Sequence, residues 1–97
     1  MKIDEKYLES KLAYQVKRYG GLTFKNISPY TRGIPDRTVI TTSGKVVFVE
    51  LKTPGCKPSP LQQVCIDSIN ALGAKAIVID SLESLNAFLF QNFGPQL

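Results

Sequence analysis

The chain has 97 residues and a mass of 10.7 kDa, enough for one small hydrophobic core and too little for a separate cofactor-binding domain. Hydrophobic residues make up 43% of it and charged residues 21%, which excludes a disordered, collagen-like or coiled-coil protein. The absence of histidine, with only two cysteines, excludes serine–histidine triads and Cys/His zinc sites. We expect residues 1–97 to form a single domain.

The two cysteines, Cys56 and Cys65, are typical of a protein from a reducing compartment. No apolar secretion segment precedes them, so we expect unreactive thiols and a cytoplasmic location. The longest near-continuous apolar run, Val46 to Val49, is far shorter than the roughly 20 residues that span a bilayer. A soluble protein with no membrane partner is therefore expected.

The net charge of +4 is unevenly distributed along the chain. Residues 10–57 contain nine lysines and arginines and only two acids, a net charge of +7, whereas residues 1–9 carry −1 and residues 58–97 carry −2. A basic block of this kind is often no more than a solvated face. Its only two acids, Asp36 and Glu50, belong to the motif considered below.

The N-terminal third predicts a helix, a strand and a loop. Over residues 4–19 the apolar residues recur at helical spacing, and the double glycine at 20–21 ends the pattern. Residues 22–28 alternate weakly, with the polar Asn26 at a position of the apolar set, and favour a strand. Two prolines and a glycine make residues 28–35 an exposed loop.

Residues 37–42 and 45–52 are β-branched runs on either side of Ser43-Gly44, which is a strong hairpin signal. A loop over residues 53–59 follows, because prolines and a glycine interrupt the pattern there. Ser59 is suited to cap a helix whose first residue is Pro60, and Gly73 ends that helix.

The last part of the chain predicts a strand and a helix. Residues 76–79 are wholly apolar, as in a strand that is buried on both faces. Asp80 and Glu83 form a possible capping box for a final helix that continues to about Phe90. The order α, β, β, β, α, β, α predicts an α/β fold, in which an antiparallel three-stranded meander and a fourth strand make a mixed sheet flanked by helices.

The candidate chemistry lies at the end of the hairpin. Side chains two apart on a strand share a face, so Glu50 and Lys52 project together, at the end of a row with Val46 and Phe48 that we expect to be buried. Because the turn at residues 43–44 folds the strands against each other, Asp36 should lie close to Glu50.

Two adjacent carboxylates repel unless one is protonated or a cation lies between them. With only oxygen donors available, the expected cation is Mg²⁺ or Mn²⁺. Lys52 would then orient an attacking water or stabilise negative charge on a phosphate, which outlines a phosphodiesterase site. The plainer interpretation is an ion pair of Glu50 with Lys52 or Arg37, since an E-x-K triplet alone is common.

A longer pattern is more specific than the triplet. Gly33-Ile34-Pro35-Asp36, then Val47-Phe48-Val49-Glu50-Leu51-Lys52, then Ser59-Pro60-Leu61-Gln62 resembles the viral-type replication-repair nuclease (VRR-NUC) domain of the PD-(D/E)xK nuclease superfamily. The resemblance covers roughly residues 5–80. It implies a restriction-endonuclease-like αβββαβ(α) core, with which the order of elements predicted from periodicity agrees.

The resemblance also implies site residues. Asp36 and Glu50 would be metal ligands, with the backbone carbonyl of Leu51 as a third, and Lys52 would be the catalytic lysine. The family has a glutamate on its first helix, for which we favour Glu9 over Glu5, because the helix dipole alone would explain an acid in the first turn. Gln62 matches the family's glutamine and would lie near the metal and position water or phosphate.

Basic residues on or beside the elements leading to this site are candidates for contacts to the DNA backbone. They are Lys25, Arg32, Arg37 and Lys57. Tyr30 could stack on an unpaired base, although a tyrosine packed against its own loop is the simpler expectation. The remaining aromatic residues, Tyr7, Tyr14, Phe24, Phe88, Phe90 and Phe93, are predicted to lie in the core or an interface.

The sequence thus predicts a Mg²⁺- or Mn²⁺-dependent endonuclease. Nothing in it resembles a sequence-reading module, so selectivity should come from DNA structure. Stand-alone members of the family that it resembles are virus-associated and act on branched DNA such as four-way (Holliday) junctions, which would place the protein in the host cytoplasm if it is viral. Paired incision would require a homodimer. The alternatives are an inactive DNA-binding module and a subunit that tethers another enzyme.

Overall fold

The computed structural model describes residues 2–95, which form three helices and four strands in the predicted order. Helix α1 (Glu5–Arg18) begins at Asp4, whose side chain accepts a hydrogen bond from the amide of Tyr7, and three apolar residues along one stripe are fully buried. Strands β1 (Leu22–Lys25), β2 (Arg37–Ile40) and β3 (Val46–Leu51) follow, then α2 (Pro60–Ala71), β4 (Ala76–Ile79) and α3 (Leu82–Phe93).

The four strands form one mixed sheet in the order β1-β2-β3-β4. The first three pair antiparallel, and β4 pairs parallel with β3 after the crossover through α2. This arrangement confirms the predicted α/β class with a mixed sheet flanked by helices. In the β2–β3 register, Arg37 lies opposite Val49, so that Asp36, just before β2, comes level with Glu50.

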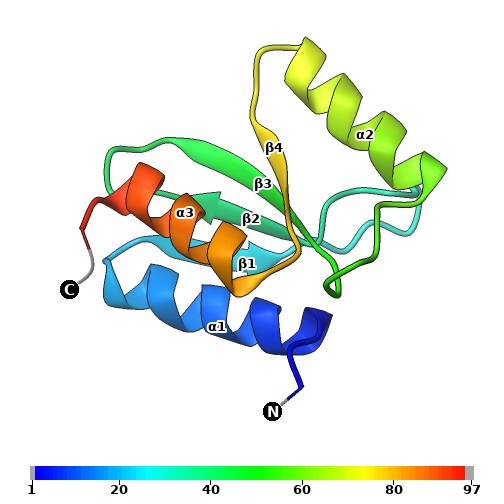
Figure 1. Cartoon of the computed structure of the whole chain (residues 1–97). Coiled ribbons are helices and arrows are strands. Elements are labelled where there is room, and N and C mark those ends of the chain that lie inside the picture. The colour runs from blue at the N-terminus through cyan, green and yellow to red at the C-terminus, as the bar shows by residue number, and fades with distance from the viewer. Residues whose placement is uncertain (1, 96–97) are drawn as a thin grey trace.

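Helices α1 and α3 lie together on one face of the sheet, whereas α2 stands apart from them beside β4 (Figure 1). The core lies between α1, α3 and the sheet. It contains Leu8, Leu12, Val16, Val39, Val47, Val49, Leu51, Ile79, Leu85, Phe88 and Leu89. Burial of each large aliphatic side chain contributes roughly 1.5–3 kcal/mol. The side chains that alternate with Val47, Val49 and Leu51, including Glu50, therefore face away from this core.

The face of the sheet that carries Glu50 is more open than expected. The row of Val46, Phe48 and Glu50 is not uniformly buried, because Val46 is 43% exposed and Phe48 is only partly buried. Phe24 and Leu22 of β1 are also exposed on this face. The reason is that α2 packs along β4 and leaves the β1 side of the face uncovered.

The last helix also differs from the prediction. It starts one residue later than expected. Ser81 is the N-cap and exchanges capping-box hydrogen bonds with Ser84, so the expected Asp80–Glu83 box is wrong. A hydroxyl in the N-cap position satisfies the free amides as well as a carboxylate would. The helix continues to Phe93, where Gly94 ends it with a φ of 90°. Among residues 2–95, no helix is both long enough and apolar enough to cross a bilayer.

The aromatic residues expected in the core or an interface divide between the core and the surface of the single chain. Phe88 is buried, and Tyr19 stacks on Phe93 with ring centres 5.2 Å apart. Tyr14 and Phe90, by contrast, are 62% and 64% exposed. Both lie on helix positions that turn away from the sheet, since only one stripe of each helix contacts the core.

Candidate active site

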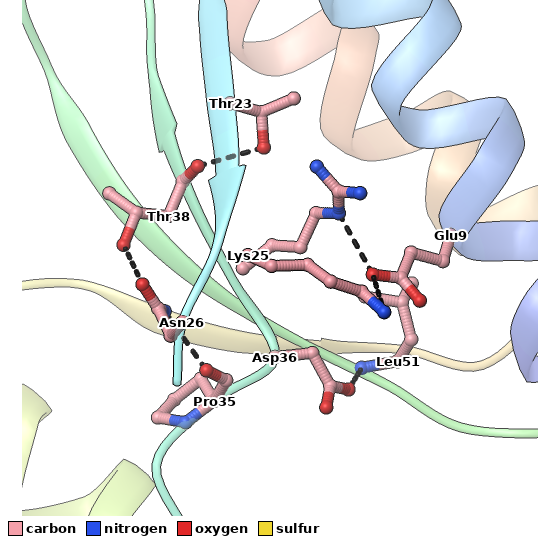
Figure 2. Close-up of polar contacts among 9 residues, drawn as sticks. Glu9, Thr23, Lys25, Asn26, Pro35, Asp36, Thr38 and Leu51 are labelled. Atoms are coloured by element: carbon pink, nitrogen blue, oxygen red, sulfur yellow. Dashed lines mark hydrogen bonds and ion pairs between the residues drawn. The ribbon is translucent and has the colours of Figure 1, made fainter. Parts of the chain in front are cut away.

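The site lies where β2 begins and β3 ends. Asp36 directly precedes β2 and its Oδ2 accepts a hydrogen bond from the backbone amide of Leu51 over 2.8 Å, which ties the start of one strand to the end of the other (Figure 2). Glu50 precedes Leu51 on β3 and comes level with Asp36 in the register. The predicted juxtaposition of Asp36 and Glu50 at the end of the hairpin thus follows from strand pairing.

Glu50 is a buried acid with unsatisfied oxygens. Its relative exposure is 0%, and its two carboxylate oxygens are the buried side-chain atoms that lack a hydrogen-bond partner within residues 2–95. Native proteins rarely leave such atoms unpartnered, because an unpaired buried carboxylate is destabilising by several kcal/mol. These oxygens therefore need a proton or a cation.

Lys52 is the nearest positive charge to Glu50. Its Nζ lies 3.6 Å from Oε2 of Glu50, and only 17% of its side chain is exposed. The pairing reproduces the ion pair of the plainer interpretation, and Lys52 lies just beyond the end of β3. One ammonium at this distance partly balances the charge but leaves both carboxylate oxygens without a hydrogen bond.

The pKa of Glu50 is raised from its ordinary value of 4.5 to about 7. Burial is the main cause, because removal from water disfavours the charged form, and the negative charge of Asp36 adds to it. Lys52 acts in the opposite direction and lowers the pKa. Near neutral pH the group is thus divided between a protonated acid and a carboxylate that lacks sufficient positive charge around it.

This raised pKa predicts how the stability of the metal-free protein depends on pH. The folded state holds the Glu50 proton more tightly than the unfolded state, so its stabilising effect is complete below pH 4.5 and disappears as the pH rises through about 7. A shift of this size corresponds to on the order of 3 kcal/mol. Glu50→Gln, which stays neutral, should therefore gain stability over the wild type at pH 8 but little at pH 5.

Urea unfolding in EDTA at the two pH values measures this difference. If Glu50→Gln and the wild type differ by the same free energy at pH 5 and at pH 8, the burial of an ionisable carboxyl has no thermodynamic effect.

The donor set suits a hard divalent cation. No group of three or more His, Cys, Asp or Glu residues is gathered in the described part of the chain, so Asp36 and Glu50 would be the only side-chain ligands. Mg²⁺ is commonly held by one or two carboxylates, with waters and substrate phosphate completing its shell. The amide of Leu51 points toward Asp36, and that of Lys52 points the other way, to Ile79 of β4. The carbonyl of Leu51 therefore faces the Asp36 side, where it would be a third ligand.

Glu9 lies in a different group of charges (Figure 2). Its Oε2 accepts a hydrogen bond from Nε of Arg37 over 2.9 Å and is 3.7 Å from Nζ of Lys25. Arg37 and Lys25 are cross-strand partners on the face of the sheet that α1 covers, the opposite face from Glu50. Glu9 and Arg37 are thus ion-pair partners, and neither side chain is directed toward Glu50. Glu5, the other first-helix acid, donates a hydrogen bond from its backbone amide to the Thr53 hydroxyl over 3.2 Å.

Gln62 lies at the start of α2, where its side chain completes a capping box. Its Oε1 accepts from the amide of Ser59 over 2.8 Å, and its own amide donates to the Ser59 hydroxyl. The loop before Asp36 reaches the same place, because a Cβ on Gly33 would lie 2.6 Å from the carbonyl oxygen of Leu61. The absence of a side chain at Gly33 thus brings the Gly-Ile-Pro-Asp segment against the first turn of α2.

Three of the four basic candidates have exposed side chains, and two of these three form no ion pair within residues 2–95. Arg32 and Lys57 are exposed, and neither takes part in an ion pair within residues 2–95. Lys25 has a side chain that is 63% exposed beside Glu9. Tyr30 is 96% exposed, so the expectation that it packs against its own loop is wrong. A loop with two prolines and a glycine offers its ring no neighbour to cover it.

Sequence reasoning did not identify the polar residues that support this site. Asn26 contacts Pro35, Asp36 and Thr38, and Thr38 is buried although it is polar. The available signal was a polar residue at a position where the alternation of β1 called for an apolar one. A partly buried amide of this kind is favoured where its hydrogen bonds are satisfied, as those of Asn26 are.

Comparisons with known proteins agree with this architecture, although no protein-family model matches the chain. "Putative nuclease p44" of Acyrthosiphon pisum secondary endosymbiont phage 1 is 44% identical over 79 residues, which covers 81% of this chain and 85% of the relative. A solved structure described as "VRR_NUC domain" matches with a TM-score of 0.82 at 27% identity, covering 92% of this chain and 96% of the other. A "VRR_NUC domain protein" shares the fold with a TM-score of 0.75 at 15% identity, over 95% and 89% of the two chains.

Proposed function

Because the chain belongs to the VRR-NUC family of nucleases, we propose that it is a Mg²⁺- or Mn²⁺-dependent endonuclease that hydrolyses phosphodiester bonds in branched DNA, four-way junctions included. The observation that carries the proposal is that neither carboxylate oxygen of the fully buried Glu50, which is level with Asp36 and close to Lys52, has a hydrogen bond within residues 2–95. A buried carboxylate with a purely structural role normally accepts hydrogen bonds from neighbouring donors.

Each residue of the proposed site has a definite role in this proposal. Asp36, Glu50 and the carbonyl of Leu51 would hold the cation, which when bound activates water and offsets charge on the phosphate. Lys52 places an ammonium beside Glu50, where it would orient the attacking water or stabilise negative charge that develops on the phosphate oxygens. Gln62 fixes the start of α2, and its side chain would have to leave the capping box in order to reach the substrate.

The proposed DNA contacts are electrostatic. Arg32 and Lys57 have exposed side chains on segments that lead into the site, which supports contacts to phosphates. The exposed side chain of Lys25 lies beside Glu9 on the other face of the sheet and would contact DNA there. Arg37 is largely occupied by Glu9, and its contribution would be to hold Glu9 rather than the substrate. The exposed ring of Tyr30 would stack on an unpaired base at a branch point, which supports selectivity for DNA structure.

Replacing Arg32 and Lys57 by alanine should weaken DNA binding and flatten its salt dependence. Each phosphate contact that is lost reduces the slope of log K against log[salt] by about 0.9. Fluorescence anisotropy with a labelled junction between 50 and 250 mM NaCl, in Ca²⁺, measures the slope. Lys45→Ala, in the turn at the far end of the hairpin, is the matched control. Slopes equal to the wild type in both site variants would mean that these two residues do not contact DNA.

Cutting both strands of a junction requires two sites, and one chain supplies one. We therefore propose a homodimer with two-fold symmetry. Light scattering at micromolar protein should give about twice the mass of the chain, with or without a junction present. A monomer under both conditions would contradict this part of the proposal.

A cytoplasmic site of action, in the infected host if the protein is viral, is part of the same proposal. Cys56 and Cys65 are both free thiols, which supports a reducing compartment.

A substrate panel tests the proposed activity. Labelled single strand, duplex, flap and four-way junction are each incubated with Mg²⁺, Mn²⁺ or EDTA. Cleavage that requires a divalent cation and is strongest on the branched substrates is the expected result. Binding without cleavage in every lane would favour the alternative of an inactive DNA-binding module or tethering subunit.

A further inference from the structure

Asp36 lies at the neck of a loop whose middle, residues 29–32, is exposed. Strand β1 ends at Lys25 and strand β2 begins at Arg37. The loop between them includes Ile27 and Tyr30, which are 89% and 96% exposed. An exposed loop of this length has few contacts of its own to hold it, so its motion would reach whatever residue closes it. Asp36 therefore needs to be held separately from the loop.

Asn26 provides three contacts that hold the other side of this neck. Its backbone amide donates to the carbonyl of Asp36 over 2.8 Å. Its Nδ2 donates to the carbonyl of Pro35 over 2.9 Å (Figure 2). Its Oδ1 accepts from the hydroxyl of Thr38 over 2.8 Å. Pro35 is itself fully buried. The peptide groups before and after Asp36 are thus both held by one residue, the first by the side chain of Asn26 and the second by its backbone amide.

Thr38 determines which way the amide of Asn26 points. A carbonyl can only accept, so the NH₂ group must face Pro35, and Oδ1 is left for a donor, which the buried hydroxyl of Thr38 supplies. Aspartate at position 26 would offer only acceptors, so the hydrogen bond to the Pro35 carbonyl would be lost. Aspartate would also place a second negative charge beside Asp36.

We propose that Asn26 and Thr38 are positioning residues that hold the carboxylate of Asp36 in its place beside Glu50. Their polar atoms bond to the backbone of residues 35–36 and to each other, and they act on the site through Asp36. The proposal rests on the proposed function only in so far as Asp36 is a metal ligand. The hydrogen bond from the Leu51 amide to Asp36 reports the same positioning without metal or DNA.

The first test reads that hydrogen bond in the metal-free protein. An amide that donates to a carboxylate has a distinctive NMR shift, so the Leu51 amide signal reports where the Asp36 carboxylate lies. Thr38→Val and Asn26→Ala should move this signal toward its position in Asp36→Ala, whereas Thr38→Ser should keep it near the wild type. Thr23→Val is the matched control, because the Thr23 hydroxyl bonds to the carbonyl of Thr38 across the same strands but not to the neck.

The second test reads metal use. The concentration of Mn²⁺ that gives half-maximal junction cleavage should rise on the order of tenfold in Thr38→Val and Asn26→Ala and be restored in Thr38→Ser, as for partners that orient a metal ligand. Thr23→Val should need the wild-type concentration. Asn26 is only partly buried, so Asn26→Ala keeps the test valid if Thr38→Val does not fold.

The outcomes separate the two hypotheses. The positioning role would be overturned if Asn26→Ala and Thr38→Val both kept the wild-type Leu51 signal and metal requirement although Asp36→Ala abolished cleavage. If Asp36→Ala cuts at the wild-type rate, the proposed metal site itself is wrong, whatever the two positioning variants do. If Thr23→Val is affected as strongly as Thr38→Val, the effect comes from general weakening of the sheet, which also overturns the positioning role.

Discussion

Glu50→Gln should abolish DNA cleavage while leaving the fold intact and DNA binding nearly unchanged. The substitution keeps the shape of a side chain that is fully buried, and it removes a charge that the fold does not neutralise. A metal at a phosphodiesterase site is worth several kcal/mol, so the rate should fall roughly a thousandfold or more. The measurement is single-turnover cleavage of a four-way junction in saturating Mg²⁺, with binding measured by anisotropy in Ca²⁺.

Asp36→Asn should lose activity to a similar degree. Its amide group no longer offers a carboxylate to the cation, although it keeps an oxygen for the hydrogen bond from Leu51. Glu83→Gln provides a matched control, since Glu83 is an exposed acid in the first turn of α3 and is not one of the proposed site residues. Wild-type cleavage by Glu50→Gln would refute the metal-site assignment.

Lys52→Ala should reduce the cleavage rate by roughly a hundredfold to a thousandfold, with a smaller effect on affinity for DNA. This is the effect expected when one group that stabilises charge in the transition state is removed. Because Lys52 also lowers the pKa of Glu50, the comparison should be made at pH 8.5 or above, where Glu50 is ionised in both proteins.

Lys52→Arg and Lys75→Ala complete the series. Arginine retains the charge but spreads it over a planar group, so partial activity is expected. Lys75 is an exposed lysine before β4 and its removal should leave the rate unchanged. A wild-type rate for Lys52→Ala would reduce the role of Lys52 to that of an ion-pair partner for a buried acid.

Local patterns were sufficient to predict the order of the elements and the central pairing. The turn at Ser43-Gly44 and the two-residue period of β3 together place Glu50 level with Asp36, because strand register follows from the turn and the buried face. The stripe of α1 and the Ser59-Pro60 start of α2 were equally clear, since caps and helical spacing depend on neighbouring residues alone.

Contacts between distant segments could not be predicted in this way. The bond of Arg37 to Glu9 joins β2 to α1, and nothing in the pattern around either residue indicates the other. The exposure of Val46 depends on how far α2 reaches across the sheet. The capping role of Ser81 rather than Asp80 is a choice between two suitable residues, which only the chain path after β4 decides.

Titration of the metal-free protein with Mn²⁺ by calorimetry is the most direct test of the central claim. The wild type should bind the cation at a site that Glu50→Gln and Asp36→Ala both lose, and it should bind more weakly at pH 5.5 than at pH 8, because a proton on Glu50 competes with the metal. Mn²⁺ binding that is the same in wild type and both variants would contradict the assignment of these two carboxylates.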